Sequence, residues 1–188
     1  MNSVRIIGGQ WRRRLLSFPR QVGTKPGFRP TPDRVRETLF NWLGQNLEGC
    51  VCLDLFAGSG ALGFEAASRG AARVVLVEDD PLAVAALRAN QDSLGAGAEV
   101  EIVRQDALEF LRLLAPPDSA FDLVFLDPPY HRGWIERLEP LCSRLFGPET
   151  LLYIESETAL TGFGAWSVAR QGRAGQSHFH LLRQKLIR

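Results

Sequence analysis

The sequence has little cysteine, almost no lysine and no long apolar run. The three cysteines, Cys50, Cys52 and Cys142, are an odd and sparse set that does not suggest a disulfide framework. No apolar stretch reaches the roughly 18 residues of a membrane-spanning helix. Arginines also interrupt the start of the chain, where a secretory signal would need an apolar core. We therefore expect a cytoplasmic protein that does not associate with membranes.

Positive charge is concentrated at the N-terminus. Of 188 residues, 45% are hydrophobic and 23% are charged, which is typical of a globular protein. Residues 1–37 carry nine basic and two acidic side chains, a net charge of +7, so the remainder carries −6. The basic residues are Arg5, Arg12, Arg13, Arg14, Arg20, Lys25, Arg29, Arg34 and Arg36. A basic arm on an acidic body predicts contact with a polyanion such as nucleic acid.

The order of apolar patterns predicts an α/β protein. Two short strands at 4–7 and 15–18 flank Gly8-Gly9, a hairpin signal. A Pro- and Gly-rich loop at 19–30 leads to a helix that Thr31 caps and that ends at Gly49. We then expect strands at 51–56, 73–78, 99–104, 121–126 and 150–155, alternating with helices at 60–69, 81–94, 106–114 and 134–146, and a closing antiparallel pair at 163–169 and 178–187. This alternation predicts a mostly parallel, seven-stranded sheet with ligands at the carboxyl ends of its strands.

The domain organisation follows from the same pattern. Residues 1–48 form a basic hairpin and helix extension that we expect to contact nucleic acid. We expect residues 49–188 to form the main α/β domain.

The end of the first strand of this domain carries a nucleotide-binding pattern. Its glycines Gly58, Gly60 and Gly63 permit a tight turn close to a ligand, although the same G-x-G-x-x-G spacing also fits a nicotinamide enzyme. Carboxylates around the turn suit a cationic sulfonium better than an anionic dinucleotide, which favours S-adenosylmethionine. The predicted cofactor-binding residues are Asp54, Phe56, Gly58, Gly60, Glu78, Asp79 and Asp106. Helix capping is an alternative role for Asp106, and bracing of the glycine turn for Asp54.

The fourth strand ends in Asp127-Pro128-Pro129-Tyr130, the most specific pattern in the chain. An exocyclic amine of a base has two protons to donate, and the Asp127 carboxylate and the Pro128 carbonyl can accept both. Tyr130 offers a ring on which an extruded base can stack. We therefore predict that Asp127, Pro128 and Tyr130 are catalytic, in methyl transfer to a base amine.

The histidines do not predict a metal site. His178 and His180 share one strand face, and His131 follows Tyr130, but no third ligand accompanies either group. We expect no metal cofactor.

Together these motifs resemble the bacterial 16S ribosomal RNA guanine-N2 methyltransferases. The likeness spans Arg5–Gly9, Arg29–Leu43, Asp54–Gly63 and Asp127–Tyr130. It implies a class I S-adenosylmethionine-dependent methyltransferase (Rossmann-like) fold, and methylation of a guanine during small-subunit assembly. The implied RNA-contacting residues are Arg12, Arg13, Arg14, Arg29, Arg34 and Arg36, with Thr31 near the pocket entrance. Where the family has Arg-Gly-Arg, this chain has Arg12-Arg13-Arg14, which leaves the local turn in question.

Three other functions stay open at this point. The glycine turn fits a nicotinamide oxidoreductase, and the basic arm fits a non-enzymatic RNA-binding assembly factor. The Asp-Pro-Pro-Tyr pattern would also serve an adenine-amine DNA methyltransferase. The resemblance favours 16S ribosomal RNA, within an assembly intermediate of the small subunit, as the partner of a monomeric enzyme.

Overall fold

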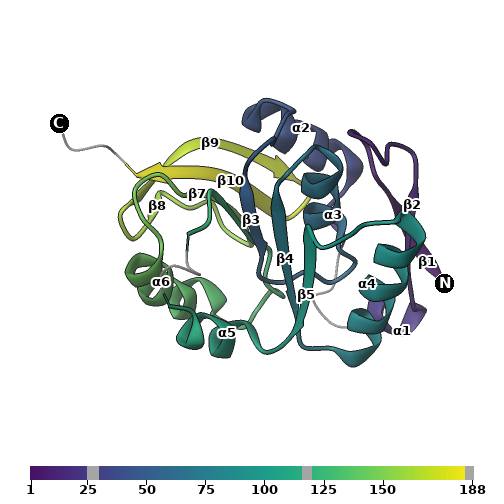
Figure 1. The fold of residues 1–188 in the computed structure, drawn as a ribbon. Helices are drawn as coiled ribbons and strands as arrows, with labels where there is room; N and C mark the ends of the chain where they lie inside the picture. The colour runs from purple at the N-terminus through teal and green to yellow at the C-terminus, as the bar shows by residue number, and fades with distance from the viewer. Residues whose placement is uncertain (25–29, 116–119, 185–188) are drawn as a thin grey trace.

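A computed structural model describes residues 1–24, 30–115 and 120–184 (Figure 1). The helices are α1 (Arg20–Gly23), α2 (Asp33–Leu43), α3 (Ala61–Ser68), α4 (Pro81–Leu94), α5 (Ala107–Leu113) and α6 (Trp134–Leu145). The strands are β1 (Asn2–Arg5), β2 (Leu15–Phe18), β3 (Val51–Asp54), β4 (Arg73–Glu78), β5 (Val100–Arg104), β6 (Leu123–Leu126), β7 (Leu151–Ser156), β8 (Gly162–Phe163), β9 (Trp166–Ala174) and β10 (Ser177–Gln184). Within these residues, no helix is long and apolar enough to cross a membrane.

One sheet organises the molecule, in the strand order β5-β4-β3-β6-β7-β10-β9-β8. The first five of these strands are parallel, and β10 and β9 pair antiparallel beyond β7. The predicted alternation and the closing antiparallel pair are therefore confirmed. The sheet has eight strands rather than seven because the two-residue β8 pairs with β9 at the edge.

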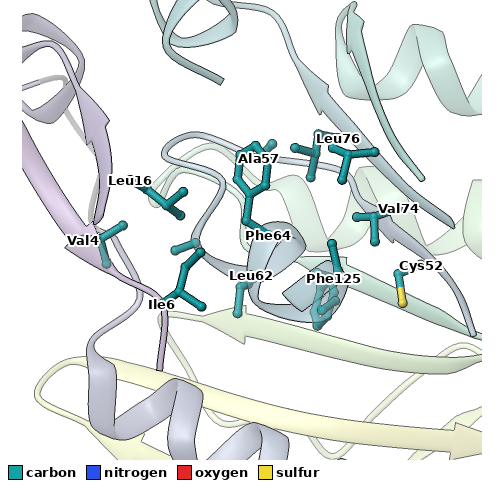
Figure 2. Close-up of a cluster of buried hydrophobic side chains, with 14 of the residues drawn as sticks. Val4, Ile6, Leu16, Cys52, Ala57, Leu62, Phe64, Val74, Leu76 and Phe125 are labelled. Atoms are coloured by element: carbon teal, nitrogen blue, oxygen red, sulfur yellow. The ribbon is translucent and has the colours of Figure 1, made fainter. Parts of the chain in front are cut away.

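Two hydrophobic cores cover the two faces of the sheet. Alternate residues of a strand point to opposite faces, so Cys52 joins the core beneath α2, α3 and α4, whereas Leu53 joins the core beneath α5 and α6. In Figure 2, side chains from the N-terminal strands lie beside Phe64 of α3, within the same cluster as Leu76 and Phe125 of the sheet. The N-terminal extension thus packs into one core of the sheet domain, and the division near residue 48 stays a prediction.

A buried carboxylate connects the N-terminal extension to α2 and α3. Glu65 of α3 is fully buried and accepts hydrogen bonds from the backbone N–H groups of Ile7 and Gly8, both at 2.8 Å. Its two oxygens also form ion pairs with Arg36 of α2 at 3.2 Å and with Arg69 at 2.8 Å. Loss of Glu65 would leave the buried Arg69 without its ion-pair partner and Arg36 with Asp33 alone.

The Gly8-Gly9 pair does not form the tight hairpin turn that its sequence suggests. Residues 6–14 form a longer connection, in which the N–H of Ile6 donates to the carbonyl oxygen of Arg14 and the N–H of Arg13 donates to that of Ile6, both at 2.9 Å. A Cβ atom at Gly9 would lie 1.8 Å from the carbonyl oxygen of Ser68. The glycines are therefore needed because this segment approaches the end of α3 closely.

The segment before α2 differs from the sequence prediction in two ways. The short helix α1 lies within the predicted 19–30 loop. Thr31 does not cap α2, since Pro32 occupies the N-cap position without a side-chain hydrogen bond. The helix ends at Leu43, six residues earlier than expected, because Gly44 adopts a left-handed conformation with φ of +93°.

Candidate active site

A cavity of about 460 Å³ opens at the carboxyl ends of β3, β4 and β6 and beside the start of α5. Asp127 lines this cavity. Six of the seven predicted cofactor residues also line it, namely Asp54, Phe56, Gly58, Glu78, Asp79 and Asp106. Gly60 does not line it but shapes the turn, where its φ is +78° and an added Cβ would lie 2.5 Å from Phe64. The topology thus brings together residues that are more than 70 positions apart in the sequence.

Asp54 is a buried carboxylate with spare hydrogen-bonding capacity. Its Oδ2 accepts a hydrogen bond from the N–H of Gly63 at 3.0 Å, which braces the glycine turn. Its Oδ1 is buried and has no hydrogen-bond partner in the described structure. Burial and the nearby Glu78 raise the pKa of Asp54 from 3.8 to about 7. A cationic ligand in the cavity would offset this cost of burial.

Glu78 joins the glycine turn to the start of α4. Its Oε2 accepts from the N–H of Gly58 at 2.8 Å, and its Oε1 accepts from the N–H of Asp80 at 2.9 Å. Each carboxylate oxygen has a second lone pair, which leaves acceptors for a ligand hydroxyl. Burial is the largest cause that raises the pKa of Glu78, and Asp79 raises it further.

The other two acids differ in their contacts. Asp106 caps α5, where its Oδ1 accepts from the N–H groups of Leu108 and Glu109, so the capping role is confirmed. The same side chain lines the cavity, and capping and ligand contact can therefore coexist. Asp79 also lines the cavity, as does its neighbour Asp80, which caps α4.

Asp127 also lines the cavity, directly after β6, which is the strand beside β3. Its Oδ2 accepts a hydrogen bond at 3.2 Å from the hydroxyl of Thr31, the residue expected to cap α2. Burial, followed by the charges of Glu155 and Asp54, raises the pKa of Asp127 well above its ordinary value. Pro129 lines the same cavity. The carboxylate is thus held by a side chain 96 positions away, a contact that the local sequence did not predict.

Pro128 and Tyr130 line a second, smaller cavity of about 120 Å³. It adjoins the larger one, since Pro129, Arg132 and Trp134 line both. His131, whose φ is +62°, makes an ion pair with Glu157 at 3.1 Å, which ties this loop to the end of β7. The Asp-Pro-Pro-Tyr segment therefore forms the wall between the two cavities.

Two aromatic rings also border the larger cavity. Phe56 and Trp134 meet edge to face, with ring centroids 5.0 Å apart. The indole N–H of Trp134 is buried and has no hydrogen-bond partner in the described residues. Trp134 was not among the predicted site residues, although its place at the first residue of α6, shortly after the Asp-Pro-Pro-Tyr segment, was a signal that it lies at the ligand end.

The predicted RNA-contacting arginines divide into two groups. Arg12, Arg13, Arg14 and Arg34 are exposed, and Arg14 donates to the carbonyl oxygen of Ser93 near the end of α4. Arg36 is fully buried, with ion pairs to Asp33 at 2.6 Å and to Glu65 at 3.2 Å. The assignment of Arg36 to the RNA surface is therefore corrected, because its guanidinium is enclosed between α2 and α3. Arg29 lies outside the described residues.

Comparison with known proteins places the chain in a family. The model of the family described as conserved hypothetical protein 95 matches residues 4–183. Ribosomal RNA small subunit methyltransferase D of Escherichia coli is 43% identical over 187 residues, which cover 97% of this chain and 90% of that protein. The chain belongs to this family. The predicted family resemblance is thus confirmed.

Solved structures agree with this membership. An Escherichia coli structure is 42% identical and superposes with a TM-score of 0.84 over 98% of this chain and 99% of its own. An RNA methyltransferase from Salinibacter ruber, solved with S-adenosyl-L-homocysteine, is 23% identical with a TM-score of 0.66 over 85% of this chain and 97% of its own, and shows the shared fold. The class I methyltransferase fold expected for the family is confirmed.

Proposed function

We propose that this protein transfers a methyl group from S-adenosylmethionine to the exocyclic N2 amine of a guanine in small-subunit ribosomal RNA. One observation carries the proposal: the glycine turn after β3 and the Asp127 carboxylate after β6 line the same cavity. Family membership supports the ribosomal substrate, since the Escherichia coli relative is named for it.

The residues of the larger cavity fit the proposed donor. The unpartnered Oδ1 of Asp54 is a buried acceptor for a cationic group, and Glu78 retains acceptors for ribose hydroxyls. The edge-to-face rings of Phe56 and Trp134 provide apolar surface for a flat ring. When bound, S-adenosylmethionine supplies an electrophilic methyl group on a sulfonium.

The chain's own residues position the amine and take its proton. The Asp127 carboxylate and the Pro128 carbonyl accept the two amine N–H groups, which aims the nitrogen lone pair into the larger cavity. The raised pKa of Asp127 makes its carboxylate a better proton acceptor. Tyr130, in the smaller cavity, stacks on the extruded base. Catalysis by this arrangement is mainly positioning.

The exposed arginines of the N-terminal extension supply contacts to RNA phosphates. We propose that Arg12, Arg13, Arg14 and Arg34 bind 16S ribosomal RNA within an assembly intermediate, in the cytoplasm, and that the protein acts as a monomer. Replacing Arg12, Arg13 and Arg14 with glutamine should weaken RNA binding and flatten its dependence on salt, because fewer counterions are released. Affinities measured at several salt concentrations test this, and an unchanged slope would remove the triplet from the interface.

Two measurements test the proposed activity. Calorimetry should detect binding of S-adenosylhomocysteine and not of NADH; binding of NADH alone would favour an oxidoreductase. Small subunits from a strain that lacks the gene should then accept labelled methyl groups from the purified protein, at a guanine amine located by mass spectrometry. Methylation of an adenine amine in DNA instead would overturn the substrate assignment.

A further inference from the structure

A buried acid lies beside Asp127 at the end of the neighbouring strand, since Leu126 of β6 and Ile154 of β7 are paired in register. Glu155 of β7 has 4% of its surface exposed, and it is one of the charges that raise the pKa of Asp127. Three hydroxyl groups surround its carboxylate: Tyr153 donates to Oε1 at 2.8 Å, Ser177 donates to Oε2 at 3.1 Å, and Thr31 also interacts with it. No described Lys or Arg makes an ion pair with this acid.

Thr31 links the two acids. Its side chain is buried, and its hydroxyl donates to Oδ2 of Asp127 at 3.2 Å while it lies beside Glu155. A hydroxyl has one proton to donate, so it can stabilise only one of the two carboxylates at a time. The side chain is positioned by α2, because the Nε of Arg36 donates to the backbone oxygen of Thr31.

We propose that Glu155 and Thr31 are positioning residues for Asp127: the charge of Glu155 strengthens Asp127 as a proton acceptor, and Thr31 fixes the orientation of its carboxylate. This inference rests on the proposed methyl transfer. In that reaction the amine nitrogen bonds to the methyl carbon of the donor as the carbon–sulfur bond breaks, S-adenosylhomocysteine leaves with that electron pair, and one amine proton moves to an oxygen of Asp127. A like charge close by makes that transfer more favourable.

Other titratable or charged groups also pack around the pair. They are Asp54 on β3, Tyr130 after β6, Tyr153 on β7 and Arg36 on α2. The two variants below leave all of them in place.

The test follows the carboxyl carbon of Asp127 by ¹³C NMR as the pH is varied, in free protein labelled at Asp and Glu. Asp127→Asn identifies the resonance. Glu155→Gln removes the neighbouring charge and should lower the pH of half-titration by about one to two pH units. Thr31→Val removes the hydroxyl that stabilises the carboxylate and should raise it by about half to one pH unit. Thr31→Ser, which keeps the hydroxyl, should leave it within about 0.3 pH units.

The proposal is supported if the half-titration pH of Asp127 falls in Glu155→Gln and rises in Thr31→Val. Any other pattern overturns it, because general loosening of the site would shift this pH in the same direction in both variants. If Glu155→Gln does not fold, the titration of the wild-type protein decides. Two acids that interact each show both titration steps in their carboxyl resonances. If Asp127 and Glu155 each showed a single, independent step, the proposal would be overturned. The NMR experiment needs neither RNA nor donor. An inactive wild-type protein would therefore refute the proposed function without affecting this result.

Turnover provides a second readout. The acid limb of kcat/KM against pH should move to lower pH in Glu155→Gln and to higher pH in Thr31→Val. A change in rate with an unmoved acid limb would show that these residues act on folding or on RNA binding instead.

Discussion

The carboxylates of the two neighbouring cavities are held by different kinds of donor, on what we propose are the cofactor side and the catalytic side of the site. On the cofactor side, Asp54, Glu78 and Asp106 accept hydrogen bonds from backbone N–H groups no more than 20 positions away. On the proposed catalytic side the donors are side-chain hydroxyls: Asp127 accepts from Thr31, 96 positions away, and Glu155 accepts from Ser177, 22 positions away, and from Tyr153 on its own strand.

This difference has a physical consequence. Backbone N–H donors cannot rotate, so the acids on the cofactor side are fixed by the fold of their own turns. Hydroxyl groups can rotate and exchange partners, so the acids on the catalytic side can change protonation without a change of backbone. We expect substitutions on the cofactor side to alter affinity and stability, and those on the catalytic side to alter chemistry.

The largest expected effect comes from Asp127→Ala. Loss of the acceptor and base should reduce kcat by about 10²- to 10⁴-fold, while the Kd for S-adenosylhomocysteine stays within about threefold, since the cofactor side is intact. Single-turnover assays and calorimetry measure the two quantities. Asp92→Asn, at an exposed site on α4, is the matched control and should leave both unchanged. Loss of cofactor binding with residual turnover would reverse the assignment of the two sides.

Asp54→Asn tests how much the burial of the Asp54 carboxylate on the cofactor side lowers the stability of the folded protein. Because the folded protein keeps the Asp54 proton up to about pH 7, whereas an unfolded aspartate loses it near 3.8, wild-type stability falls as pH rises through this window. The asparagine variant has no such loss. Between pH 5 and pH 8 its stability relative to wild type should therefore rise by about 2 to 3 kcal/mol. Urea unfolding at both pH values measures this, and an equal difference at each pH would contradict it.

Glu78→Gln should produce a smaller change, confined to affinity. The variant keeps the shape of the side chain but loses its charge and one of its two strong acceptors for the N–H groups of Gly58 and Asp80. We expect the Kd for S-adenosylhomocysteine to rise about 10-fold, with kcat at saturation nearly unchanged. Asp79→Asn, also in the cavity, should change the Kd less than threefold. If Glu78→Gln and Asp79→Asn raised the Kd equally, the negative charge of the cavity, and not the hydrogen bonds of Glu78, would determine affinity.

The same contrast explains how much could be predicted from the sequence. Six of the seven residues predicted for the cofactor side do line the cavity, because its acids lie at or just after the ends of β3, β4 and β5, and the carboxyl ends of parallel strands meet at one edge of the sheet. Asp127 was predicted for the same reason. The role of Thr31 was missed, because Thr-Pro-Asp is also a good helix start and its partner is 96 positions away.

Two other features were not predicted from the sequence, because they also depend on contacts between distant segments. Arg36 belongs to a basic segment, and only the packing of α2 on α3 shows that Glu65 encloses it. Glu155 did leave a signal, since an acid that follows four apolar residues of a buried strand is unusual. That signal indicates a special position but not its partners, two of which, Thr31 and Ser177, come from other segments of the chain.

The smallest expected effect tests a feature that is encoded locally. Arg13 holds a φ of +72°, at the position where the family resemblance led us to expect glycine. A positive φ destabilises an arginine by roughly 1 to 3 kcal/mol. A glycine there avoids this strain but loses more backbone entropy on folding, which costs roughly 0.5 to 1 kcal/mol. Arg13→Gly should therefore stabilise the protein by about 1 kcal/mol and raise Tm by about 2 to 4 °C. Arg12→Gly removes the same charge without relieving a positive φ and should not raise Tm. Since both variants lose one arginine, their RNA affinities should fall equally. If Tm rose in both, the gain in stability would come from the lost charge and not from relief of backbone strain.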